Sequence, residues 1–173
     1  LKFSKGLELQ SIDHYTTFKN LKTLELTLNK WSSEVTVLII RKAGDSLTSL
    51  TIGEGEVDHT INDDTLKALT TYCPKIKSLS ISSMTQESLN MLFSYIRDLK
   101  LNTLQMNCTM ETMIISDDLF NYIKYQNSLS SLGINYGYWN YNDDKHHHFL
   151  KLLKKHKIRL IRYRPSTFYV SKN

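Results

Sequence analysis

A recurring spacing of apolar residues constrains this chain more than any other feature of its sequence. The unit is an apolar residue, two others, a second apolar residue, one other and a third apolar residue. The six copies begin at Leu21, Leu47, Ile76, Leu101, Leu129 and Ile158. Successive copies are 26, 29, 25, 28 and 29 residues apart. Such a period predicts one supersecondary unit per copy, stacked on its neighbours so that together they bury a continuous core.

Each copy predicts a short strand with one apolar and one polar side. The middle apolar positions, which we expect to form one buried row, are Leu24, Leu50, Leu79, Leu104, Leu132 and Ile161. Polar residues such as Thr23 and Glu25 lie between the apolar ones. Successive side chains of a strand point to opposite faces, so one face of the sheet should meet water. We expect parallel strands in one sheet near 23–26, 49–52, 78–81, 103–106, 131–134 and 160–162.

Helical patterns separate these strands, and most open on short polar or acidic residues. Asp63-Asp64, Asp117-Asp118 and Asp143-Asp144 each stand at an expected helix start. Acids are favoured there by the helix dipole, and a short polar side chain can accept a hydrogen bond from a free backbone N–H. We therefore interpret the three pairs as parts of helix starts and not as paired catalytic carboxylates.

Two α/β architectures alternate strand and helix in this way. A doubly wound sheet has helices on both faces and needs strands that are apolar throughout. The polar residues interleaved in these strands favour a leucine-rich-repeat solenoid instead, with a parallel sheet on the concave face of a horseshoe and helices on the convex face. We expect residues 1–164 to form about six to seven repeats, and residues 165–173 to form a C-terminal tail.

One repeat narrows the expectation to a family. Residues 61–81 read INDDTLKALTTYCPKIKSLSI and resemble the cysteine-containing repeat of F-box/leucine-rich-repeat proteins, with a composition similar to fungal F-box-like sets. The resemblance implies a protein-binding module that recognises the substrate of a ubiquitin ligase complex. The F-box, through which such a protein would contact the ligase adaptor, is absent from these residues. The expected partner is thus a substrate protein of unknown identity.

We expect no catalytic site, cofactor or metal, and therefore no enzyme. Cys73 fills a core position in the repeat that the chain resembles, and no acid or histidine stands at a useful spacing from it. His146, His147 and His148 are adjacent. Adjacent residues on a helix point roughly 100° apart, so these three side chains cannot converge on one ion.

The candidate partner-binding residues come from an aromatic loop and from the polar face of the sheet. They are Tyr136, Tyr138, Trp139, Tyr141, Glu25, Gln105 and Asn107. Tyr and Trp dominate binding hot spots, and small polar residues on a sheet allow a partner to approach closely. The alternative for the aromatic loop is that its rings pack against the adjacent helix.

Charge leaves a second functional class open. The net charge is +5, and the excess of Lys and Arg is concentrated in 145–164. This basic end supports an alternative function, an RNA- or anionic-surface-binding scaffold, although we regard nucleic acid as the weaker expectation because a terminal repeat must also face water. No stretch approaches the roughly 18 apolar residues of a membrane span, so we expect no membrane partner. The two cysteines form no disulfide framework, which favours the cytoplasm or nucleus.

Overall fold

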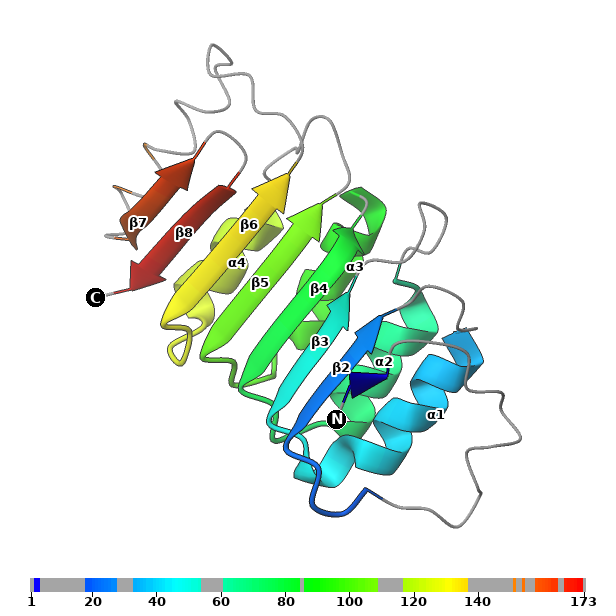
Figure 1. Cartoon of the computed structure of the whole chain (residues 1–173). Helices are drawn as coiled ribbons and strands as arrows, with labels where there is room; N and C mark the ends of the chain where they lie inside the picture. The colour runs from blue at the N-terminus through cyan, green and yellow to red at the C-terminus, as the bar shows by residue number, and fades with distance from the viewer. Residues whose placement is uncertain are drawn as a thin grey trace.

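The computed structural model describes residues 2–3, 18–27, 33–53, 61–84, 86–108, 117–136, 151, 154, 158–164 and 167–172. Their main feature is one eight-stranded sheet with the order β1-β2-β3-β4-β5-β6-β8-β7. The strands are β1 (Lys2–Phe3), β2 (Thr23–Thr27), β3 (Ser49–Gly53), β4 (Ser78–Met84), β5 (Thr103–Cys108), β6 (Ser131–Tyr136), β7 (Ile158–Arg164) and β8 (Thr167–Lys172). Figure 1 shows them side by side, with the helices behind.

The first six strands are parallel, and their register follows the sequence repeat. Leu24 pairs with Leu50, Leu50 with Leu79, Leu79 with Leu104, and Leu104 with Leu132. All five side chains are buried, which confirms the expected row for these positions. The expected strand positions are confirmed too, because each of β2 to β7 covers the segment assigned to it.

Four described helices form the second layer. They are α1 (Ser33–Ala43), α2 (Asp63–Tyr72), α3 (Gln86–Ile96) and α4 (Asp117–Tyr125), and all four lie on the same face of the sheet (Figure 1). A short 3-10 turn, η2 (Gly44–Ser46), follows α1. Apolar side chains from both layers meet in one continuous core, in which Ile39, Leu66 and Leu92 of the helices are fully buried. The opposite face of the sheet carries half-buried polar residues such as Ser49 and Thr51.

The acid pairs that the structure describes lie at helix starts, as expected. Asn62 precedes α2, and its side chain accepts a 3.0 Å hydrogen bond from the backbone N–H of Thr65. Asp63 and Asp64 occupy the first turn, where the helix dipole favours negative charge. Asp117 likewise begins α4. Asp143-Asp144 lies outside the described residues.

The C-terminal end of the sheet differs from the expectation. We expected the segment at 160–162 to continue the parallel sheet, but β8 lies between β6 and β7 and pairs antiparallel with both. The residues from 165 onward, expected to be a tail, therefore contain a strand. The physical reason is that the edge of β6 still offers unpaired N–H and C=O groups, and β8 satisfies them by running back along it.

The fold class is corrected accordingly. The sheet is mixed and ends in an antiparallel pair of strands, so it is not the all-parallel concave sheet of a leucine-rich-repeat horseshoe. We describe the fold as a two-layer α/β arrangement with helices on one face. None of the described helices is long and apolar enough to cross a membrane.

Candidate functional site

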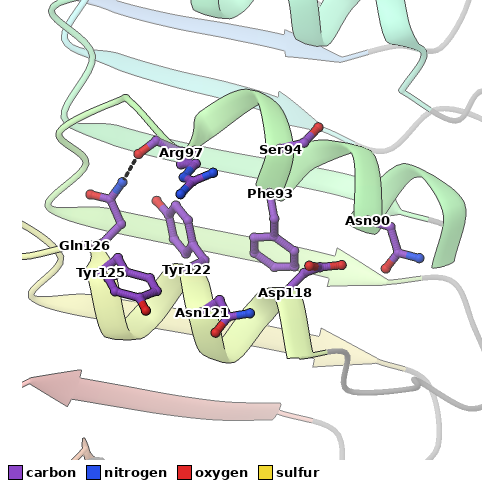
Figure 2. Close-up of a pocket in the computed structure, with 9 residues that line it drawn as sticks. All are labelled: Asn90, Phe93, Ser94, Arg97, Asp118, Asn121, Tyr122, Tyr125 and Gln126. Atoms are coloured by element: carbon purple, nitrogen blue, oxygen red, sulfur yellow. Dashed lines mark hydrogen bonds between the residues drawn. The ribbon is translucent and has the colours of Figure 1, made fainter.

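A pocket opens between α3 and α4, on the helical side of the molecule. Its volume is about 360 Å³, which falls within the range usual for small-molecule sites. The lining residues are Asn90, Phe93, Ser94, Arg97, Asp118, Asn121, Tyr122, Tyr125 and Gln126. We call this site the α3–α4 pocket; Figure 2 shows its side chains.

Helical spacing brings these residues to one place. On α3 the lining positions are 90, 93, 94 and 97, and on α4 they are 118, 121, 122, 125 and 126. Residues three or four apart share one face of a helix, so each helix turns a single face toward the pocket. Arg97 and Gln126 follow directly after the last residues of their helices and lie at the C-terminal end of the pocket. Asn90 and Asp118 lie near the N-terminal end.

The pocket exists because the helices separate along the layer. Helices α1 and α2 pack closely, α2 and α3 less so, and α3 and α4 least of all. The rings of Phe93 and Tyr122 bridge the gap, with centroids 5.4 Å apart and planes tilted by 39°. Tilted aromatic pairs at this distance are favourable. The pair forms an apolar floor, above which polar side chains line the sides.

The hydroxyl of Tyr122 is the unusual group in the site. Tyr122 is 5% exposed, and its Oη has no hydrogen-bond partner among the described residues. Burial raises the pKa of the phenol well above its ordinary value, so the hydroxyl keeps its proton and remains a donor. An unsatisfied buried hydroxyl costs about 1–3 kcal/mol. A buried donor left unpaired at this cost calls for an explanation, and a ligand acceptor would supply one.

A positive charge, that of Arg97, lies at the end of the pocket where the Tyr122 hydroxyl is found. The side chain of Gln126 donates from Nε2 to the backbone carbonyl of Arg97, which ties the end of α4 to the end of α3. Tyr122 lies one turn before Gln126. Figure 2 shows the Arg97 guanidinium at the same end of the pocket as the Tyr122 hydroxyl. This end therefore combines a cationic group with a neutral donor, an arrangement suited to a carboxylate.

The other end of the pocket carries the opposite charge. Asp118 is exposed in the first turn of α4, and Figure 2 shows it near Asn90, away from Arg97. Neither the Asp118 carboxylate nor the Arg97 guanidinium has a hydrogen bond or an ion pair within the described part of the chain. The exposed Asn121 lies three positions after Asp118 on α4. The pocket thus has a positive end, a negative end and an aromatic floor.

The binding residues expected from the sequence lie elsewhere. Glu25 and Gln105 are half-buried on the open face of the sheet, on strands linked by the register through Thr51 and Ser80. Three strand spacings separate Glu25 from Gln105, which is roughly 14 Å. The structure thus places the two on one face without bringing them together. Whether this face binds a partner stays a prediction.

Asn107 lies on the same face, in β5. Its Nδ2 donates to Ser82 Oγ at 2.9 Å, while its Oδ1 is covered and has no partner among the described residues. The loop residues expected beside it, Tyr138, Trp139 and Tyr141, lie outside the described residues, and of Tyr136 only the backbone, at the end of β6, is described.

Cys73 occupies the core position that the sequence suggested. It is fully buried at the end of α2. Burial, and to a lesser degree the charge of Asp45, raise the pKa of its thiol to about 12. The thiol therefore stays protonated and cannot act as a nucleophile at neutral pH. The described residues contain no group of three or more His, Cys, Asp or Glu side chains that could hold a metal ion.

Comparisons with known proteins reveal no family for this chain. No protein-family model matches the chain, and no curated protein matches it. One similar solved structure is a release-factor-specific protein-(glutamine-N5) methyltransferase from Alicyclobacillus acidocaldarius. It is 12% identical with a TM-score of 0.34, and the match covers 82% of this chain and 91% of that chain. A TM-score this low transfers neither a fold nor an activity.

These findings correct the interpretation made from the sequence. No family model and no curated relative supports a leucine-rich-repeat or an F-box family, and the antiparallel strands at the C-terminal end do not fit the all-parallel sheet expected of such a protein. We therefore withdraw the fungal F-box/leucine-rich-repeat identification, the role in substrate recognition for a ubiquitin ligase, and the scaffold alternative for RNA or anionic surfaces. The exclusion of an enzymatic role, which rested on that family and on the lack of a recognisable catalytic motif in the sequence, is withdrawn as well.

Proposed function

We propose that this chain binds a small molecule through a carboxylate, or a similar acceptor group, in the α3–α4 pocket. The observation that carries the proposal is the Tyr122 hydroxyl, which is buried without a partner among the described residues in a pocket that Arg97 also lines. A guanidinium offers several N–H donors in a planar fork that matches a carboxylate, and a phenol can add one further donor.

Arg97 is the exposed side chain that lies at the same end of the pocket as the Tyr122 hydroxyl (Figure 2). Tyr122 Oη is not reached by solvent, whereas the Arg97 side chain is exposed. An exposed arginine changes its rotamer readily, so its guanidinium can turn outward and leave room for an anion between itself and the phenol. The apolar part of the ligand would then lie against the rings of Phe93 and Tyr122. Burial of that surface adds binding free energy that a bare anion would not gain.

The test deletes only the hydroxyl. Phenylacetate, which has one carboxylate and one ring, is titrated into the protein and its Kd is measured by NMR. Tyr122→Phe should weaken binding by roughly tenfold to a hundredfold, since a hydrogen bond to a charged group contributes about 1.5–3 kcal/mol. The same substitution should not lower the free energy of unfolding of the ligand-free protein, because the hydroxyl it removes has no hydrogen-bond partner among the described residues.

A matched control comes from α2. Tyr72 is half-buried with its ring beneath the Arg41 guanidinium, outside the α3–α4 pocket. Tyr72→Phe should leave the Kd for phenylacetate unchanged. If Tyr122→Phe binds phenylacetate as tightly as the parent protein, or loses stability in step with binding, the hydroxyl is a structural group and the proposal is wrong.

We also propose that the protein works in the cytoplasm or nucleus. The buried Cys73 is a free thiol, and an unpaired cysteine in a core is usual in a reducing compartment.

A further inference from the structure

The two ends of the α3–α4 pocket carry opposite charges that nothing in the described part of the chain neutralises. Arg97 supplies the positive end and Asp118 the negative end, and both side chains are exposed. Neither forms an ion pair with a described residue. A ligand that placed only a carboxylate at Arg97 would leave the Asp118 end unused. The pocket would therefore complement a molecule that also carries a cationic group.

The separation of the two ends excludes a compact ligand. Asn90 and Arg97, like Asp118 and Tyr125, are seven positions apart along their helices, which is about 10 Å at the ordinary rise per residue. Long side chains that turn inward shorten this span. An α-amino acid carries both charges on one carbon atom and cannot reach both ends. A molecule as long as two or three extended residues, about 7–10 Å, can do so.

We infer that the ligand of the α3–α4 pocket is an elongated zwitterion, with its carboxylate at Arg97 and Tyr122 and its ammonium at Asp118. This inference rests on the proposed function and names its ligand class. The aromatic floor of Phe93 and Tyr122 contacts the middle of the ligand, and Asn121 lies where it can pair with a polar group there. Both an ω-amino acid and a short peptide with free ends have this chemistry.

The experiment compares zwitterions of increasing length with a ligand that lacks the ammonium. Glycine, γ-aminobutyrate, ε-aminocaproate and triglycine are titrated beside caproate, and each Kd is measured by NMR. Affinity should rise from glycine to ε-aminocaproate, which should bind about threefold to fivefold more tightly than caproate, the usual scale of an exposed ion pair. Tighter binding of triglycine than of ε-aminocaproate would identify the ligand as a short peptide. The reverse order would identify it as an ω-amino acid.

Charge deletion at Asp118 provides the second arm. Asp118→Asn should remove the advantage of ε-aminocaproate over caproate, so that the two Kd values become similar. Asp64→Asn, the same change in the first turn of α2 and outside this pocket, should alter neither value. If caproate binds as tightly as ε-aminocaproate, or affinity is independent of length, the zwitterion is wrong while the anion site stands. If none of the carboxylates binds, the proposed function fails as well.

Discussion

Leu79→Ala is expected to lower the free energy of unfolding by about 2–5 kcal/mol, the range for a large-to-small substitution in a packed core. Leu79 is fully buried in β4, between Leu50 and Leu104 of the neighbouring strands. Its row runs across the parallel part of the sheet, so neighbouring strands and helices cannot collapse on the cavity without losing their own contacts. Chemical denaturation followed by circular dichroism measures the loss.

The residue next to it provides the control. Ser80 follows Leu79 in the same strand but is half-buried on the open face of the sheet. Ser80→Ala should change the free energy of unfolding by no more than about 0.5 kcal/mol, as is usual for a surface substitution. Similar losses of unfolding free energy at both positions would show that the two faces of the sheet are equally buried. That result would contradict the two-layer packing.

Gly44→Ala is expected to cost about 3 kcal/mol or more, at the upper end of the penalties for overpacking. Gly44 begins the 3-10 turn after α1. A Cβ at this position would lie 2.1 Å from the carbonyl oxygen of Tyr72 and 2.7 Å from its carbonyl carbon. These are backbone atoms at the end of α2, so no side-chain rotation relieves the clash, and the ends of α1 and α2 must move apart.

Asp45→Ala is the matched control for Gly44→Ala. Asp45 is the next residue in the same turn and is exposed, so its replacement should change the free energy of unfolding by less than about 0.5 kcal/mol. A thermal midpoint for Gly44→Ala equal to that of the parent protein would mean that α1 and α2 do not approach at Gly44 as closely as described.

The parallel part of the fold could be predicted because its signal is local. Alternation of apolar and polar residues places Leu24 inside and Thr23 outside without knowledge of the partner strand. The pairing of β7 and β8 could not be predicted in this way. An amphipathic strand fixes which face is buried, but not which edge it joins or in which direction it runs. The segment at 158–164 therefore matched the repeat spacing while pairing antiparallel.

The α3–α4 pocket could not be recognised from the sequence for a related reason. Tyr122 and Phe93 stand at helix positions that are indistinguishable from ordinary core positions, and Arg97 and Asp118 from solvated surface charges. What makes them a site is the wider spacing between two helices, which only the packed structure reveals. The sequence does show polar and aromatic residues spaced along one face of each helix, but this pattern alone does not indicate a pocket. Glu25 and Gln105, chosen from the sequence, lie on the opposite side of the sheet.

If the ligand binds between α3 and α4, a map of backbone amide shifts on titration with phenylacetate will locate it there. We expect the largest shifts within residues 90–97 and 118–126, with Arg97, Tyr122 and Gln126 among them. Open-face residues such as Ser80 and Gln105 should stay unperturbed. Shifts concentrated on the open face, or the absence of any saturable shift, would contradict binding in the α3–α4 pocket.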